Sequence, residues 1–350
     1  MVILENISLA PFTTFGIGGP ARWFGAATNE DEIAETTEWA RGRGIPLFVL
    51  GGGSNLLVSD GGFPGLVLHI TLRGIERDGG LFRVGAGENW DDCVRQAIEA
   101  GYAGMECLTG IPGTVGGTPV QNVGAYGQEV SSVIERVRAF DMVERKFVEF
   151  SRSECGFAYR RSRFNSTDRG LYIVTRVDYR LREGGAPMFR YPDVQREMES
   201  RPAGGTPSLK EVAAAVRKIR QSKGMLLVDG DPNCRSAGSF FKNPVVGEEF
   251  LSRAVAQGTP HFPAGPGAEN LGRVKIPAAW LIEQAGFRKG YAMGAAGISS
   301  RHTLALVNIG GPRGGATAEE ILALAENIQE AVEGRFGIQL EMEPERVGFA

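Results

Sequence analysis

The chain has 350 residues, 42% of them hydrophobic and 23% charged, which is the composition of a globular protein with two or three domains. The net charge of −3 gives no electrostatic reason to bind nucleic acid or an anionic membrane, so we expect neither as a partner. No run approaches the ~20 apolar residues of a membrane span and the N-terminus lacks a signal-peptide pattern, so we expect a cytoplasmic protein.

Glycine is the unusual residue type, because the 50 glycines are about twice the share of roughly 7% found in average proteins. This excess indicates backbone sites that need a positive φ or the close approach of a ligand. The four cysteines and three histidines are spaced too irregularly to predict a metal site or a disulfide. Gly-Lys never occurs, and no G-x-G-x-x-G stands between a strand and a helix, so the common nucleotide-binding loops are absent.

The first 70 residues predict a small α+β unit. Residues 28–44 offer an N-cap, three acidic residues in the first turn and glycines at the end, which together are typical of a helix. The apolar run 45–50 predicts a strand, and residues 56–70 predict two more strands around a glycine turn.

Residues 71–207 predict a second unit. A helix is expected from Asn89, and the glycine- and proline-rich segment 104–128 that follows it excludes a helix. The clearest strand is expected over 171–182, with one face buried and the other in solvent. Its inward positions are expected to be Leu171, Ile173, Thr175, Val177, Tyr179 and Leu181. Residues 183–207 have the composition of a loop and linker.

Residues 208–350 predict a third unit, with the boundary near Pro207. Ser208 and Glu211 form the capping-box pattern of one helix, and Thr317 and Glu320 form that of another. In the second helix the apolar residues share one face, namely Ile321, Leu324, Ile328 and Ala331. The run IQLEME (338–343) predicts a strand in which the last glutamate points away from the apolar side.

Two glycine-rich loops are candidates for binding phosphate. A glycine turn after a buried strand can present several backbone amides to an anion, although a tight turn without a ligand explains the first loop equally well. The second loop favours a ligand, because two amide-rich loops suit a diphosphate. The candidate residues are Gly51, Gly52, Gly53, Ser54, Asn55, Ile111, Pro112, Gly113, Thr114, Gly116, Gly117, Asn122, Gly124 and Ala125.

Seven ordered motifs carry a resemblance to a known family: TFGIGGPA, GGGSNLL, GAGENW, IPGTVGGTPVQNVGAYG, FAYRRSRF, AGSFFKNP and AAWLIEQAGF. From about Pro11 to Glu343 the chain resembles the UDP-N-acetylenolpyruvoylglucosamine reductases (MurB). The resemblance implies an α+β protein with the FAD-binding fold of the vanillyl-alcohol oxidase and p-cresol methylhydroxylase type. Two α+β subdomains, 1–70 and 71–207, would hold FAD, and a C-terminal α+β domain, 208–350, would bind substrate.

The resemblance also implies the reaction. NADPH would reduce a non-covalently bound FAD, and flavin N5 would pass hydride to C3 of the enolpyruvyl ether of UDP-N-acetylglucosamine-enolpyruvate while an acid protonates C2. The product would be UDP-N-acetylmuramate, a peptidoglycan precursor of the bacterial cell wall. The partners implied are therefore the small-molecule UDP-sugar and NADPH, and we expect a monomer.

Three catalytic residues follow from the resemblance: Ser239 as proton donor, Arg160 and Glu343. Considered alone, Ser239 could be a turn hydroxyl or a helix cap, Arg160 a surface charge and Glu343 a solvated glutamate. Residues 340–346 read LEMEPER, so a shift of two residues in the alignment with the family would make Glu345, and not Glu343, the active-site glutamate.

Five substrate-binding residues are implied in the same way: Tyr126, Tyr191, Lys223, Asn243 and Gln284. Tyr191 lies in the long segment near 183–207, which matches the family subtype whose tyrosine loop closes over the substrate diphosphate. Gly117 stands where some relatives carry serine, so the resemblance implies no hydroxyl contact at this position.

Two other functions are considered. A flavin-dependent oxidase of the same fold would often need a histidine for covalent attachment, but His69, His261 and His302 lie outside the expected flavin loops. A non-catalytic UDP-sugar or flavin-binding regulator would be expected to lose the residue types at the three catalytic positions, and all three types are present.

Overall fold

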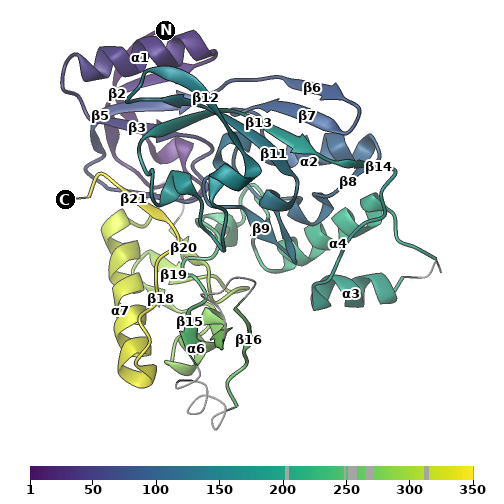
Figure 1. Cartoon of the computed structure of the whole chain (residues 1–350). Helices are drawn as coiled ribbons and strands as arrows, with labels where there is room; N and C mark the ends of the chain where they lie inside the picture. Colours follow the sequence, from purple (N-terminus) through teal and green to yellow (C-terminus); the bar gives the residue numbers. More distant parts are fainter. Residues whose placement is uncertain (202–204, 248–249, 251–257, 265–271, 311–314, 350) are drawn as a thin grey trace. The chain divides into compact units, whose positions relative to one another are not determined.

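The computed structural model describes residues 1–201, 205–247, 250, 258–264, 272–310 and 315–349 (Figure 1). The chain forms two compact units. Unit 1 comprises Met1–Ile7, Ala21–Gly53 and Pro64–Ser222, and unit 2 comprises Ser8–Pro20, Ser54–Phe63 and Lys223–Ala350. Among the helices of the described ranges, none combines the length and the apolar character that crossing a bilayer requires.

A four-stranded sheet lies at the N-terminal end of the chain, with the order β1-β2-β5-β3. Its strands are β1 (Ile3–Ser8), β2 (Pro20–Ala27), β3 (Leu47–Leu50) and β5 (Phe63–Ile70), and β3 runs parallel to β5. Helix α1 (Glu30–Arg41) connects β2 to β3 and confirms the helix expected over 28–44. The Asn29 side chain accepts a hydrogen bond from the Glu32 amide at 3.0 Å, so the expected N-cap is present.

A five-stranded antiparallel sheet with the order β12-β11-β13-β7-β6 forms the rest of the unit 1 framework. The strands are β6 (Ile75–Asp78), β7 (Leu81–Gly85), β11 (Ile134–Asp141), β12 (Lys146–Ser151) and β13 (Tyr172–Arg180). The expected inward positions of β13 are buried from Ile173 to Leu181, but Leu171 lies before the strand and is 39% exposed. Val174 and Asp178 are also buried, so the second face of β13 is less solvated than the alternation predicted.

Short elements surround the glycine-rich segment of unit 1. They are α2 (Trp90–Glu99), β8 (Tyr102–Ala103), η2 (Glu106–Leu108), η3 (Val115–Gly117), β9 (Gly124–Ala125), β10 (Gln128–Glu129), η4 (Val130–Ser132), η5 (Arg152–Cys155), η6 (Arg163–Asn165) and β14 (Arg182–Glu183). Segment 104–128 contains only single 3-10 turns and two-residue strands, as its glycine content predicted.

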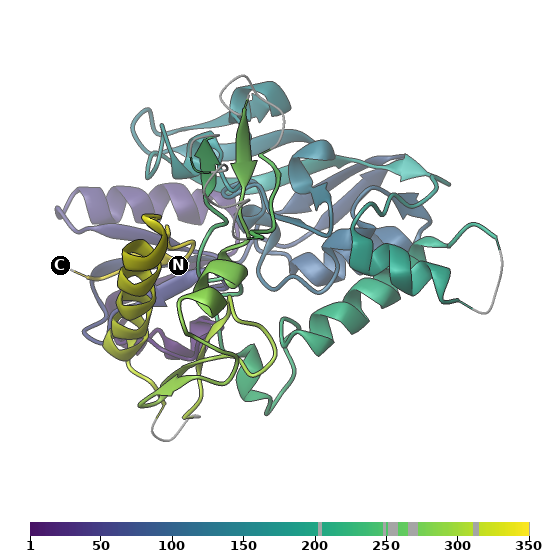
Figure 2. The ribbon, with the colours of Figure 1, turned by 90° about the horizontal axis from the view of Figure 1, so that it is seen from below.

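Helices α3 (Pro192–Glu199) and α4 (Leu209–Ser222) pack side by side (Figure 2). Helix α3 lies within the segment expected to be loop and linker, which corrects that prediction. A proline in its first turn starts the helix, and Val194 and Met198, four residues apart, bury one face against α4.

Unit 2 joins two N-terminal segments to the C-terminal part of the chain. It contains η1 (Ala10–Phe12), β4 (Leu56–Val58), η7 (Pro232–Cys234), β15 (Val245–Gly247), β16 (Phe262–Pro263), β17 (Arg273–Lys275), α6 (Ala278–Gln284), β18 (Ala292–Met293), β19 (Ala296–Ile298), β20 (Leu306–Asn308), α7 (Ala318–Phe336) and β21 (Glu345–Val347). The sheet orders are β15-β17-β16 and β18-β19-β20, and β21 pairs in parallel with β4. The core includes Phe15, Ile17 and Leu57 together with Phe240 and Leu281.

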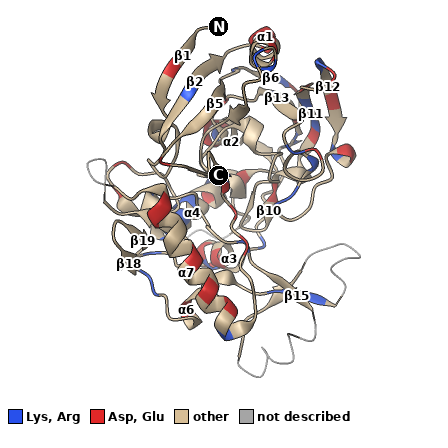
Figure 3. Cartoon of the chain, turned by 90° about the vertical axis from the view of Figure 1, so that its left-hand side faces the viewer, with Lys and Arg blue, Asp and Glu red and all other residues tan. Residues whose placement is uncertain are grey.

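Helix α7 has the capping box that the sequence predicted. The Thr317 hydroxyl accepts from the Glu320 amide at 3.1 Å, and the Glu320 carboxylate accepts from the Thr317 amide at 2.9 Å. Ile321, Leu324 and Ile328 are fully buried, whereas Ala331 is half-buried. Exposed acidic residues line the other side, namely Glu319, Glu326, Glu330 and Glu333 (Figure 3).

Two expectations about the C-terminal part differ from the structure. The expected domain 208–350 began with α4, but this helix packs on η2, α2 and α3 and so belongs to unit 1. The strand expected over 338–343 is a single bridge at Met342, since its partner segment pairs with it only at Phe241, and the strand β21 begins later, at Glu345. Both errors arise from contacts between segments far apart in the sequence.

Candidate active site

The two glycine loops that were expected to share a diphosphate lie against each other in unit 1. A Cβ atom on Gly52 would lie 2.5 Å from the Gly113 Cα, and one on Gly51 would lie 2.9 Å from the Thr114 Oγ1. Gly53 and Gly113 have φ values of +60° and +123°, which disfavour other residue types. Contact with the Gly113 backbone therefore requires glycine at position 52, whereas the positive φ favours glycine at position 53, and the two loops lie directly against each other.

Backbone hydrogen bonds join the second loop to the N-terminus of α2 and to the residues just before it. The Trp90 amide donates to the Gly113 carbonyl at 3.1 Å, the Val115 amide to Glu88 at 2.9 Å and the Gly116 amide to Ala86 at 2.8 Å. A Cβ on Gly116 would lie 2.7 Å from the Ala86 Cβ, whereas one on Gly117 would meet nothing within 4 Å. The loop is thus rigid at residues 113–116 and has room for a side chain or a ligand at Gly117.

The remaining cofactor candidates lie on both units. Asn122 is buried with a φ of +46°, and its side chain donates to Glu129 and to the Ala158 carbonyl while accepting from the Ser131 amide. Its side chain therefore shapes the loop that carries Gly124 and Ala125. Ile111 and Pro112 are half-buried in unit 1. Ser54 and Asn55 belong to unit 2.

Arg160 contacts the same loop within unit 1. Its Nη2 donates to the Gly124 carbonyl at 2.8 Å, and its φ is +53°. Among the described residues, five other than glycine have a positive φ, and three of them are Asn122, Tyr126 and Arg160. Such backbone conformations cost of order 1–3 kcal/mol each and are concentrated at functional sites.

Ser239 and Glu343 lie on neighbouring segments of unit 2. The Glu343 amide donates to the Phe240 carbonyl at 2.8 Å, and the Lys242 amide donates to Glu341 at 2.9 Å. These bonds and the antiparallel bridge between Phe241 and Met342 place the two segments side by side. Ser239 and Glu343 are both half-buried, and they lie on adjacent segments that pair at Phe240–Phe241 and Met342–Glu343.

Asn55 connects the first glycine loop to the glutamate segment. Its Nδ2 donates to the Glu343 carbonyl at 3.1 Å, and its own carbonyl accepts from the Glu345 amide at 2.9 Å. Glu345 is the first residue of β21 and pairs with Leu56, whereas Glu343 lies beside Phe240. The two rival glutamates therefore have different neighbours.

Two of the three expected substrate residues of unit 2, Asn243 and Gln284, lie at α6. The Asn243 Oδ1 accepts from the Ala278 amide at 2.9 Å at the start of this helix, and Gln284 is its last residue. The Gln284 carbonyl accepts a hydrogen bond from Arg335. Lys223 contributes, with Lys289, to lowering the pKa of His302 to about 4, although burial of the imidazole is the main cause.

The two expected tyrosines meet in unit 1. The rings of Tyr126 and Tyr191 are 5.4 Å apart between centroids and nearly perpendicular, at 89°. Arg220, which the sequence did not single out, lies beneath them: its Nε donates to the Gly110 carbonyl at 3.0 Å and its guanidinium also hydrogen-bonds Tyr126. Burial lowers the pKa of Arg220 from its usual value. Arg220 is the last residue of the basic run RKIR (217–220), and only its burial in the structure distinguishes it from a surface arginine.

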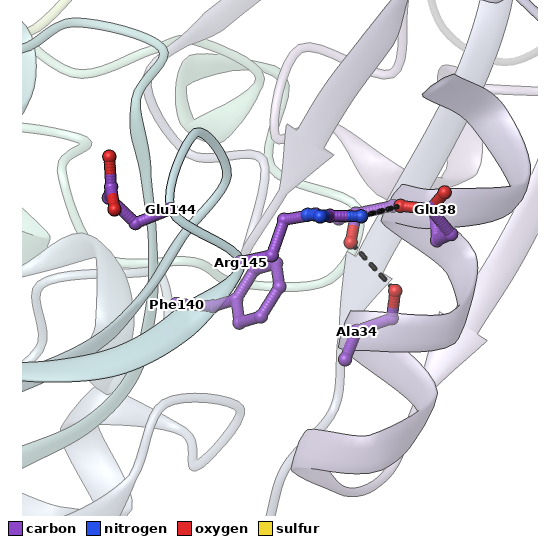
Figure 4. A pocket seen from close by; sticks show the side chains of 6 residues that line it. Ala34, Glu38, Phe140, Glu144 and Arg145 are labelled. Carbon is purple, nitrogen blue, oxygen red and sulfur yellow. Dashed lines mark hydrogen bonds and ion pairs between the residues drawn. The ribbon is translucent and has the colours of Figure 1, made fainter. Parts of the chain in front are cut away.

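A hollow of about 320 Å³ lies elsewhere in unit 1, between α1 and the turn that joins β11 to β12 (Figure 4). Its lining residues are Ala34, Thr37, Glu38, Phe140, Glu144 and Arg145, none of which is an expected site residue. Arg145 reaches across it to Glu38 at 3.5 Å, which is an exposed ion pair. The hollow therefore does not belong to the candidate active site.

Comparison with known proteins supports a flavin site. A family model described as an FAD binding domain matches residues 23–146, and one described as the C-terminal domain of UDP-N-acetylenolpyruvoylglucosamine reductase matches residues 231–347. The protein is thus an FAD-dependent oxidoreductase with an FAD-binding α+β fold. The two glycine loops pack directly on each other at Gly52 and Gly113 and leave open space beside Gly117, which fits the close approach of a diphosphate such as that of FAD.

Individual relatives match nearly the whole length of the chain. The UDP-N-acetylenolpyruvoylglucosamine reductase of Streptomyces coelicolor is 45% identical over 99% of this chain and 91% of its own length. That of Thermobifida fusca is 44% identical over 98% of each chain. The crystal structure of the Thermus caldophilus enzyme superimposes with a TM-score of 0.68 at 29% identity, covering 99% of this chain and 100% of the other. The chain belongs to the UDP-N-acetylenolpyruvoylglucosamine reductase family.

Membership defines the general function. The protein is an FAD-dependent enzyme of peptidoglycan precursor synthesis that reduces the enolpyruvyl ether of its UDP-sugar substrate. The prediction of family, fold class and enzyme class from the seven motifs is confirmed. The roles of individual residues stay predictions.

Proposed function

We propose that Ser239 donates the proton to C2 of the enolpyruvyl group, that Glu343 assists it, and that Arg160 binds the substrate carboxylate. The observation that carries this proposal is the antiparallel pairing of the segments that bear Ser239 and Glu343. A serine hydroxyl is a weak acid, so it needs a partner that stabilises the developing alkoxide or orients the hydroxyl. Because Glu343 lies beside Phe240 and Glu345 beside Leu56, the pairing favours Glu343 as this partner.

The glycine loops would hold the flavin. The residues proposed for this role are Gly51, Gly52, Gly53, Ser54, Asn55, Ile111, Pro112, Gly113, Thr114, Gly116, Gly117, Asn122, Gly124 and Ala125. FAD supplies the hydride for the reduction when it is bound, and NADPH is the reductant proposed for it. None of the residues proposed to contact the flavin is a histidine or a cysteine, so we propose that FAD is held without a covalent bond.

The UDP-sugar would be held by Tyr126, Tyr191, Lys223, Asn243 and Gln284. A lysine and tyrosine hydroxyls are suitable partners for a diphosphate, since both donate hydrogen bonds to phosphate oxygens. Tyr191 is 40% exposed and its segment precedes α3, which supports a role as a lid over the diphosphate. We also propose that the protein is a cytoplasmic monomer. All four cysteines are buried free thiols, which suits a reducing compartment.

The absorbance spectrum of the purified protein tests the proposed function. The flavin absorbance should bleach when NADPH is added without oxygen and recover when the enolpyruvyl UDP-sugar follows, and acid precipitation should release the flavin into the supernatant. Recovery by oxygen alone at a catalytic rate would favour the oxidase, and the absence of any bleaching would favour the binding protein. Colour retained in the acid pellet would contradict non-covalent binding.

A further inference from the structure

A buried carboxylate holds the segment that precedes Tyr191. Glu106 is fully buried, and its Oε2 accepts from the Gly104 amide at 2.7 Å. Its Oε1 accepts from the Met188 amide at 2.8 Å and from the Gln128 side chain at 3.0 Å. Three donors thus satisfy a group whose burial is otherwise costly.

Gln128 also binds the backbone of Met188. Its Nε2 also donates to the Met188 carbonyl at 3.3 Å, and its Oε1 accepts from the Cys107 amide at 2.8 Å. The Cys107 thiol lies 3.5 Å from the same Met188 carbonyl. The backbone amide and carbonyl of Met188 are therefore both bound by buried side chains, in the way that a neighbouring strand would bind them.

The segment held in this way is irregular, and its side chains contact neighbouring elements. Residues 185–191 form no helix or strand, and the Met188 side chain is 44% exposed. Phe189 packs on the apolar cluster between α3 and α4, and two residues later Tyr191 is the N-cap residue of α3 and contacts Tyr126. Met188 lies only three residues before Tyr191, so a shift of its backbone would be passed along the chain toward the Tyr191 ring.

We propose that Glu106 and Gln128 are positioning residues that hold Met188 so that Tyr191 is ready to close on the UDP-sugar. The inference rests on the proposed role of Tyr191 as a substrate residue. An unheld segment would have to be ordered during binding, and this entropy cost would weaken the affinity. We expect Glu106→Gln to raise the Kd and the KM for the enolpyruvyl UDP-sugar about 10-fold, with much smaller changes in kcat and in flavin reduction by NADPH.

Amide hydrogen exchange and substrate binding test the proposal together, using the FAD-loaded full-length enzyme. In Glu106→Gln the Met188 amide should exchange at least about 10-fold faster than in the native enzyme, because its acceptor is weakened. Gln128→Met retains the side-chain volume and the Glu106 bond to Met188, so it should give a smaller change of the same kind. It also provides the test if Glu106→Gln does not fold.

Asp141→Asn is the matched control. Asp141 is a buried carboxylate of the same unit that accepts from the Val143 and Glu144 amides at 2.9 and 2.8 Å, in a turn distant in sequence from Met188. Its loss should lower stability without changing the Kd for the UDP-sugar. Faster Met188 exchange at an unchanged Kd would overturn the proposal, as would unchanged exchange or an equal loss of affinity in the control. A native enzyme that does not bind the UDP-sugar would instead refute the proposed function itself.

Discussion

At the scale of single residues, Ser239 can be separated from its surroundings by the two half-reactions. If it only protonates C2, Ser239→Ala should bind FAD and be reduced by NADPH at close to the native rate, because that step needs no proton from the side chain. Reoxidation by the enolpyruvyl substrate should slow by on the order of 10²-fold or more. Stopped-flow absorbance measures both steps. Equal slowing of the two would show that Ser239 shapes the site without donating the proton, and Ser239→Cys should recover part of the loss.

Gly52 provides a residue-scale test of the contact between the two loops. In Gly52→Ala the new methyl group would meet the backbone of Gly113 at 2.5 Å, and a backbone cannot move aside as a side chain can. We expect a stability loss of about 1–3 kcal/mol and less FAD per chain. Thermal melting and the ratio of flavin to protein absorbance provide the readouts. Gly117→Ala, whose methyl group would meet nothing within 4 Å, should melt close to the native temperature.

The residues that the sequence did not predict share one physical property. Glu106, Gln128 and Arg220 are buried polar groups whose partners are remote in sequence, such as Met188 and Gly110. The residues next to them in the sequence do not indicate such a partner. From the sequence alone, the buried Arg220 therefore cannot be distinguished from an arginine on the surface. The glycine loops were predictable because a dense run of glycines is visible in the local sequence, whereas the contact between the two loops, which requires Gly52, was visible only in the structure.

At the scale of elements, the cap of α7 can be measured directly. Thr317→Ala removes the acceptor for the Glu320 amide and should lower the free energy of unfolding by about 1 kcal/mol, since one helix donor loses its partner. Chemical denaturation provides the value. Thr317→Ser keeps the hydroxyl and should recover most of the lost free energy of unfolding. A serine variant as unstable as the alanine variant would contradict the capping role.

Elements with strong local signals were predicted well, and those set by tertiary contacts were not. The helices α1 and α7 and the strand β13 were expected near their observed positions, because caps and apolar periodicity are local. Helix α3 was missed since its eight residues lie between proline- and glycine-rich stretches and their helical face is buried only against α4. The strand expected over 338–343 failed because the partner of that segment, Phe240–Lys242, supplies only one bridge.

At the scale of the whole molecule, His302 links stability to pH. Burial, with Lys223 and Lys289 nearby, lowers its pKa from 6.5 to about 4, so the unfolded chain binds more protons between these values. The contribution of this group to the free energy of unfolding is complete above pH 6.5 and falls as the pH drops toward 4, by at most about 3.5 kcal/mol at roughly 1.4 kcal/mol per pH unit. Unfolding measured from pH 7 to 4 should show a shallower decline in His302→Gln. Identical slopes for the two proteins would contradict this link.

The division of the molecule was the least predictable feature. The sequence predicts consecutive domains, whereas unit 2 combines Ser8–Pro20 and Ser54–Phe63 with the C-terminal part of the chain. Composition along the chain changes too little to indicate that Phe15 and Leu57 pack with Phe240 and Leu281. The assignment of residues 1–70 and 71–207 to separate flavin subdomains stays a prediction.

This arrangement affects how the protein is made by the ribosome. Phe15, Ile17 and Leu57 leave the exit tunnel early, but their core partners on α6 and α7 emerge only after more than 200 further residues have been translated. At roughly 5–20 residues per second this delay is on the order of 10–60 s. Until then these apolar side chains lack their native partners on α6 and α7, so the early segments of unit 2 would be natural clients for chaperones that bind nascent chains.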